Sequence, residues 1–130
     1  KKIQSQSTSN PSSISQVAAQ AALEGDQQCV KDMVKVFKQR HDYVVNALNN
    51  IDGIECLTGD GTFYVFPDFS GLQQKLNCKT DTDLAEKLLE KGIALVPGSA
   101  FGTPGHMRIS FATSDENLQK AIERLMTATA

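Results

Sequence analysis

The chain has 130 residues, of which 40% are hydrophobic and 22% charged, and its formal net charge is −2. A chain of this length fits a single domain whose core needs no disulfide or metal. The slight negative charge argues against nucleic-acid binding, which usually requires a basic excess, and the apolar runs are far too short to span a membrane. Three cysteines at irregular spacing predict free thiols and a cytoplasmic location.

Residues 4–16 consist mainly of Ser, Gln, Thr, Asn and Pro, a composition that predicts a loop or linker. This polar start contains no apolar stretch typical of a signal peptide. Because the chain begins without a methionine, we expect that it was processed or was cut from a longer protein. A short helix follows the linker and is expected to end near Gly25.

A long amphipathic helix is predicted from Asp26 to about Asn50, because apolar side chains recur there at three- and four-residue spacing. Cys29 lies near the apolar stripe of this helix and is expected to be a small core residue, whereas His41 is expected to be a half-buried structural histidine. Across the whole chain, the apolar residues expected to share one core are Val30, Val34, Phe37, Val44, Leu48, Leu84, Leu88, Ile109, Phe111, Leu118, Ile122 and Leu125.

The rest of the chain alternates between strand and helix patterns. This order predicts an α+β fold, in which a small sheet packs against the long amphipathic helix and two further helices. The strands are expected at residues 54–57, 62–66, 93–96 and 106–112, and the helices from Leu72 to Leu76, from Thr80 or Asp81 to Gly92, and after Ser114.

Most common catalytic and metal-binding patterns are absent from the sequence. The two histidines, His41 and His106, are far apart, and the cysteines lack the spacing of metal ligands. The glycine-rich segments 59–62 and 98–102 lack the lysine of a phosphate-binding loop and the spacing of a dinucleotide-binding motif. The sequence therefore predicts no metal site, and we expect both glycine-rich segments to be turns.

One residue, Arg108, has the chemistry and the setting of a binding site. Side chains alternate between the two faces of a strand, so Arg108 shares its face with the small residues Ser110 and Ala112. Small neighbours leave an open concavity beside a planar guanidinium, which can bind a carboxylate through two parallel hydrogen bonds. The alternative is a solvent-facing arginine paired with an acidic side chain, and the strand pattern by itself favours this alternative.

Five segments follow one another in a recognisable order, and none of them is distinctive alone. They are Gln6–Pro11 with Gln16 downstream, Phe37–Asp42, Gly61–Phe66, Gly92–Gly102 and Met107–Ser114. In this order and at this spacing, they resemble the C-terminal, small-domain part of fold-type-I aminotransferases, which use pyridoxal phosphate. The resemblance runs almost from end to end and is strongest to the bacterial-type aspartate aminotransferases.

The resemblance implies roles for several residues of this chain. Arg108 would hold the α-carboxylate of the amino-acid or 2-oxo-acid substrate, which reverses the preference for a solvent-facing arginine. Phe63 and Tyr64 would line the substrate side of the pocket. The segment that resembles a stretch at the subunit boundary of a homodimer, close to the neighbouring active site, consists of Ser7, Thr8, Ser9 and Asn10.

The family's lysine that binds pyridoxal phosphate lies upstream, in a Ser-Lys motif that has no counterpart here, so no catalytic residue is expected in this chain. Residues 1–25 are therefore expected to be a polar segment and short helix severed from the large cofactor domain, and residues 26–130 the small C-terminal domain. The resemblance implies a parent enzyme that transfers an amino group between an amino acid, with aspartate favoured, and a 2-oxo acid. The fragment alone is expected to be inactive.

Two alternatives remain at this point. Animal-type aspartate enzymes carry an arginine for the distal carboxylate of the substrate where this chain has Ser5, so an aminotransferase of aromatic, alanine or kynurenine specificity is also compatible with the sequence. The second alternative, from a different functional class, is a stand-alone module that binds small carboxylates without a cofactor.

Overall fold

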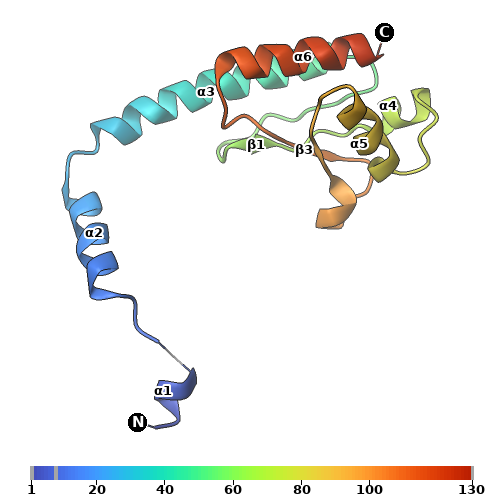
Figure 1. The fold of residues 1–130 in the computed structure, drawn as a ribbon. Coiled ribbons are helices and arrows are strands. Elements are labelled where there is room, and N and C mark those ends of the chain that lie inside the picture. The colour runs from blue at the N-terminus through green and yellow to red at the C-terminus, as the bar shows by residue number, and fades with distance from the viewer. Residues whose placement is uncertain (1, 8, 130) are drawn as a thin grey trace. The chain divides into compact units, whose positions relative to one another are not determined.

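The computed structural model describes residues 2–7 and 9–129. The chain divides into two compact units at the boundary between Val34 and Lys35, inside one long helix. The elements shown in Figure 1 are, in chain order, α1 (Gln4–Ser7), α2 (Ser13–Glu24), α3 (Gln28–Asn49), β1 (Tyr64–Val65), α4 (Ser70–Lys75), α5 (Asp81–Glu90), β2 (Val96–Pro97), the 3-10 turn η1 (Gly98–Phe101), β3 (Met107–Ser110) and α6 (Asp115–Thr129).

The N-terminal unit is helical, and none of its described residues is buried. The prediction of a loop over residues 4–16 is wrong for α1, where the Ser5 and Ser7 hydroxyls donate to the carbonyls of Lys2 and Ile3, at 3.0 and 3.3 Å. The Ile3 carbonyl also accepts the Gln6 N–H at 3.2 Å, so backbone and side-chain hydrogen bonds together form this single helical turn. The structure confirms the second helix, which ends at Glu24 before Gly25.

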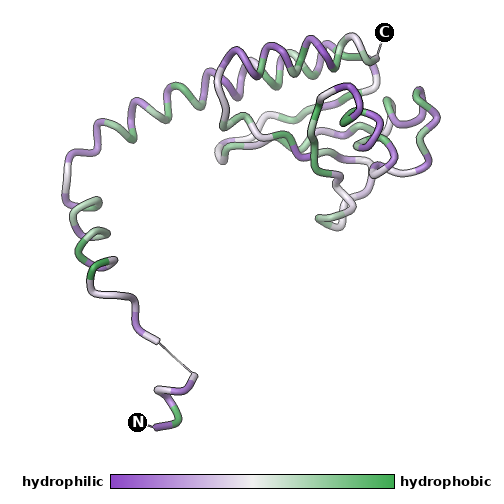
Figure 2. Tube along the Cα trace, viewed as in Figure 1, coloured by the Kyte–Doolittle hydropathy of each residue, from purple (hydrophilic) through white to green (hydrophobic). Residues whose placement is uncertain are grey.

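The apolar stripe at the start of α3 is exposed, so three residues that were predicted to lie in the core do not lie there. Val30 and Val34 were expected in the core but are 49% and 61% exposed, and Cys29 is exposed as well. Figure 2 shows apolar residues alternating with polar ones along this helix. The spacing correctly predicted the helix, but spacing identifies a face without identifying what covers it.

The C-terminal unit contains a three-stranded antiparallel sheet in the order β1-β3-β2. The strand expected at residues 54–57 is reduced to a single bridge between Glu55 and Asp68. The reason is that the Asn49 side chain occupies the backbone groups of Cys56: its amide donates to the Cys56 carbonyl at 2.9 Å and accepts from the Cys56 N–H at 2.8 Å. A side-chain amide therefore replaces a neighbouring strand there.

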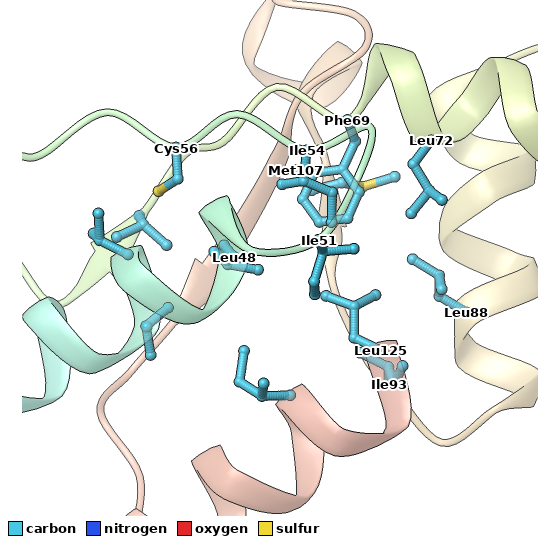
Figure 3. Close-up of a cluster of buried hydrophobic side chains, with 14 of the residues drawn as sticks. Leu48, Ile51, Ile54, Cys56, Phe69, Leu72, Leu88, Ile93, Met107 and Leu125 are labelled. Atoms are coloured by element: carbon cyan, nitrogen blue, oxygen red, sulfur yellow. The ribbon is translucent and has the colours of Figure 1, made fainter. Parts of the chain in front are cut away.

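Helices cover one face of this sheet and enclose the core, part of which is drawn in Figure 3. The C-terminal part of α3 lies beside α6 in Figure 1, and Arg40 Nε donates to Asp115 Oδ1 at 2.7 Å between them. This arrangement confirms the predicted α+β fold. The predicted core residues that are buried in the structure are Val44, Leu48, Leu84, Leu88, Phe111, Leu118, Ile122 and Leu125, while Phe37 and Ile109 pack against them.

His41 is a structural residue, as predicted, and is more deeply buried than expected, with only 5% of it exposed. Its Nε2 accepts a hydrogen bond from the Gly59 N–H at 3.2 Å, and its Nδ1 lies 3.0 Å from Asp42 Oδ1. The ring also meets Phe111 edge to face, with the ring centres 5.8 Å apart. His41 thus ties the loop before β1 to α3.

Candidate functional site

The candidate site is the face of the sheet that points away from the core. Along β3, Met107 is buried, Arg108 is partly buried and Ser110 is exposed, as the alternation of a strand requires. Tyr64 of β1 is paired with Ser110, and Val96 of β2 is paired with Arg108. Tyr64 therefore lies diagonally across from Arg108 on the same face, within reach of a long side chain.

Two aromatic rings flank the guanidinium of Arg108. Its Cζ lies 5.1 Å from the centre of the Phe101 ring and 5.9 Å from the centre of the Tyr64 ring. Both distances are typical of cation–π contacts. An aromatic ring attracts the charge of a cation but provides no carboxylate oxygen for its N–H groups.

No acidic side chain among residues 2–7 and 9–129 forms an ion pair with Arg108. The other two arginines do have oxygen partners, since Arg40 binds Asp115 and Arg124 donates to the Gly92 carbonyl at 2.9 Å. The solvent-facing alternative required an acidic partner within the chain. The described part of the chain supplies none, so the fork of Arg108 is available to a carboxylate from outside it.

Of the two predicted pocket residues, Tyr64 lies beside Arg108, whereas Phe63 contacts Tyr64. Phe63 is 53% exposed, and its ring meets the Tyr64 ring edge to face, with the centres 5.5 Å apart. The Phe63 carbonyl accepts the Phe111 N–H at 2.9 Å, which extends the pairing of β1 with the chain after β3. Phe63 therefore supports the position of Tyr64.

The segment expected at a subunit boundary belongs to the N-terminal unit. Ser7 ends α1, and Ser9 and Asn10 are exposed and outside any helix or strand. Thr8, the fourth residue of that prediction, lies outside the described residues. The predicted place of this segment at a subunit boundary therefore stays a prediction.

Sequence analysis missed the contribution of Phe101 to the site. Phe101 ends the turn η1, which follows β2 directly, and its ring also meets Phe66 edge to face at 6.0 Å. A single aromatic residue in a turn carries no periodic signal, so its contact with Arg108 could not be derived from the sequence. The sequence pointed to Phe101 only as a member of Gly92–Gly102, one of the five segments that carry the family resemblance.

Asp81, at the first residue of α5, anchors the turn that carries Phe101. Asp81 is 4% exposed, and its Oδ2 accepts the Ser99 N–H at 2.7 Å. Burial opposes the charge of this carboxylate, but hydrogen bonds from Ser99, Thr82 and Gly105 outweigh it and hold the pKa of Asp81 below its ordinary value of 3.8. An ionised carboxylate inside the protein thus holds the start of the turn at Ser99 and also the chain after it at Gly105.

The described residues do not fit covalent attachment of pyridoxal phosphate. That attachment needs a lysine, which burial makes reactive by lowering its pKa, and every described lysine is exposed.

Among residues 2–7 and 9–129, no three His, Cys, Asp or Glu side chains gather into a metal-binding group. Burial raises the pKa of the Cys56 thiol to about 11, which makes it a poor nucleophile. No described helix is long and apolar enough to cross a membrane.

Comparison with known proteins adds independent information. Residues 1–125 match the family described as aminotransferase class I and II. An aspartate/prephenate aminotransferase from Nitrosomonas europaea is 52% identical over 95% of this chain, which corresponds to 33% of that protein.

Solved structures agree with this match. The aspartate aminotransferase from Rhizobium meliloti superposes with a TM-score of 0.87 at 46% identity, over 98% of this chain and 33% of that one. The alanine aminotransferase from Pyrococcus furiosus gives a TM-score of 0.82 at 33% identity, over 90% of this chain and 30% of that one. The chain thus spans about a third of the length of the curated relatives it matches.

Proposed function

The chain belongs to the class I and II aminotransferase family, and from that premise we propose that it is the substrate-carboxylate-binding part of a pyridoxal-phosphate-dependent aminotransferase. The whole protein would transfer an amino group between an amino acid and a 2-oxo acid. The observation that supports this role is Arg108, a partly buried cation on an open sheet face with no acidic partner among the described residues.

Arg108 would act by orienting the substrate. Its planar fork forms two parallel hydrogen bonds to a carboxylate, which fixes the substrate in rotation as well as in position. Fixed orientation at a reacting carbon lowers the entropic part of the barrier. The chemistry of amino-group transfer would come from pyridoxal phosphate held by other parts of the protein, because the described residues offer no buried lysine for it.

We propose aspartate as the amino donor, because the Nitrosomonas europaea relative is an aspartate/prephenate aminotransferase and the Rhizobium meliloti relative an aspartate aminotransferase. Arg108 itself does not select aspartate, since every amino acid carries the α-carboxylate it would bind. Aspartate should therefore give a higher kcat/KM than alanine in the whole protein. The reverse order would assign the chain to an enzyme like the alanine aminotransferase of Pyrococcus furiosus.

The proposed assembly is a cytoplasmic homodimer. In this proposal, residues 1–25 belong with the large cofactor domain, residues 26–130 form the small domain, and the segment 7–10 lies near the neighbouring subunit's active site. The exposed apolar side chains of α2, Ile14, Val17 and Leu23, support the assignment of this helix to another domain, because an apolar stripe requires a partner and the chain's own N-terminal unit supplies none.

The proposed role of Arg108 is tested by Arg108→Ala in the full-length protein. We expect kcat/KM for aspartate to fall at least ~100-fold, because a charge-assisted bidentate contact is lost in a desolvated site. The melting temperature should change little, since the side chain fills no apolar core. Arg108→Lys should recover only part of the activity, because an ammonium keeps the charge without the fork.

Arg124→Ala is the matched control. Arg124 is an exposed arginine whose partner is the Gly92 carbonyl, so its removal should leave kcat/KM within about twofold of wild type. Nearly normal kcat/KM for Arg108→Ala would overturn the proposed function. Tight carboxylate binding by the 130-residue chain alone would instead favour the module without a cofactor.

A further inference from the structure

We propose that Phe101 is a positioning residue for Arg108: its ring, fixed by the Asp81-anchored turn η1, holds the guanidinium in the orientation that receives the substrate carboxylate. This inference rests on the proposed function of Arg108. It assigns to Phe101 an effect that acts through Arg108 and not through direct contact with the reacting atoms.

The first argument concerns the freedom of Arg108. An arginine side chain without an oxygen partner loses much rotamer entropy when it adopts one orientation to receive a ligand. Phe101 at 5.1 Å and Tyr64 at 5.9 Å restrict the guanidinium before any ligand arrives. Groups held in place before binding increase affinity, because the entropic cost of ordering them is no longer part of the binding step.

The second argument is that Phe101 contributes little to the core. It is 49% exposed, although an aromatic ring gains free energy by burial. Its ring meets the Arg108 guanidinium and lies nearly perpendicular to the Phe66 ring. Arg108 has no acidic partner among the described residues, so a half-exposed ring beside its guanidinium affects that cation more than the stability of the fold.

The third argument is the rigidity of the turn that carries Phe101. Besides the Asp81–Ser99 hydrogen bond of 2.7 Å, the Gly98 N–H donates to the His106 carbonyl at 2.7 Å. A Cβ at Gly98 would lie 2.2 Å from the Thr103 carbonyl oxygen, so only glycine fits there. Such close packing of backbone against backbone fixes the backbone of the turn and therefore the point from which the Phe101 side chain extends.

The test is a double-mutant cycle in the full-length enzyme with Phe101→Leu and Arg108→Ala. Phe101→Leu should raise KM for aspartate and the dissociation constant for maleate, an unreactive dicarboxylate, about three- to tenfold, with kcat changed less than about twofold. In the Arg108→Ala background, Phe101→Leu should change kcat/KM by less than about 1.5-fold, because the group it acts through is gone.

Two further variants complete the experiment. Phe101→Tyr keeps the ring and should restore KM to within about twofold of wild type. Tyr43→Leu removes a partly exposed ring that lines a hollow between α3 and α6, and it should leave both KM and the maleate dissociation constant unchanged.

The outcomes separate the two proposals. If Arg108→Ala itself is fully active, the proposed function fails. If Arg108→Ala is impaired but Phe101→Leu behaves like wild type, or lowers kcat/KM equally with and without Arg108, the positioning role fails while the proposed function stands. Failure of Phe101→Tyr to restore KM would also overturn the role assigned to the ring.

Discussion

Two charged side chains of the C-terminal unit, Asp81 and Arg108, differ in whether the chain itself supplies a partner for the charge. Asp81 is buried and accepts backbone N–H groups of its own chain, whereas Arg108 is partly buried and has no acidic partner among residues 2–7 and 9–129. A buried carboxylate with several donors contributes to stability. A cation left without an anion is costly to desolvate and is therefore expected where a ligand supplies the missing charge.

The stability contributed by Asp81 should depend on pH. Because folding holds the pKa of Asp81 below 3.8, its contribution is complete above that pH and is lost as the pH falls through the lower folded-state value. Asp81→Asn should therefore reduce the free energy of unfolding by about 1–3 kcal/mol at pH 7. The difference from wild type should narrow as the pH is lowered below 3.8.

Urea unfolding of both proteins at several pH values measures this dependence. Glu86→Gln, which removes an exposed carboxylate from the same helix, serves as the control and should cost less than about 0.5 kcal/mol at any pH. An Asp81→Asn penalty that stays constant between pH 7 and pH 3 would contradict the anchoring role of the ionised carboxylate.

At the scale of elements, short strands are held by helices with well-defined ends. The strands β1 and β2 have two residues each, too few to be stable alone, so their positions depend on the helices packed on the sheet. The helix α5 begins with a capping box in which Thr80 Oγ1 accepts the Asp83 N–H at 3.1 Å, and Asp83 Oδ2 accepts the Thr80 N–H at 2.9 Å. This cap also fixes Asp81, the next residue.

Removal of the cap should destabilise the C-terminal unit measurably. Thr80→Ala deletes the hydroxyl acceptor and should lower the free energy of unfolding by about 1 kcal/mol. Thr82→Ala, at an exposed position in the first turn of the same helix, is the control and should change it by less than about 0.5 kcal/mol. Chemical denaturation at pH 7 compares the two, and equal effects would show that the hydroxyl of Thr80 is not a significant cap.

At the scale of the whole molecule, the hydrophobic core lies in the C-terminal unit. All buried residues of the described chain lie between His41 and Leu125, and those before Val34 are exposed. Burial of apolar surface is the main favourable contribution to folding, so cooperative unfolding should come from the C-terminal unit alone. The N-terminal unit should contribute little to stability in the isolated chain.

Deletion of residues 1–25 tests this expectation. The shortened chain should show one cooperative thermal transition whose midpoint lies within about 3 °C of that of the 130-residue chain. Deletion of residues 115–130 is the matched control at the other end, because it removes the buried Leu118 and Leu125 of α6 and should abolish the cooperative transition. A large loss of stability on deleting residues 1–25 would show that they pack on the core.

The sequence by itself determined the α+β class, the helices after α1 and the place of Arg108 on a strand. The helices α2, α3, α5 and α6 follow from local signals, since a 3.6-residue period, a cap or a glycine stop acts within a few residues along the chain. The alternation around Arg108 is equally local, and it correctly placed Arg108 and Ser110 on the outer face of β3.

Only the tertiary structure decided which surfaces are covered and which side chains meet. The stripe of Val30 and Val34 has the spacing of a buried face, yet burial depends on a partner that spacing does not specify. The contact of Phe101 with Arg108 and the anchoring by Asp81 join residues that are distant in sequence or lie in turns. Such contacts arise when sheet pairing and helix packing bring distant segments together, and no local pattern in the sequence encodes them.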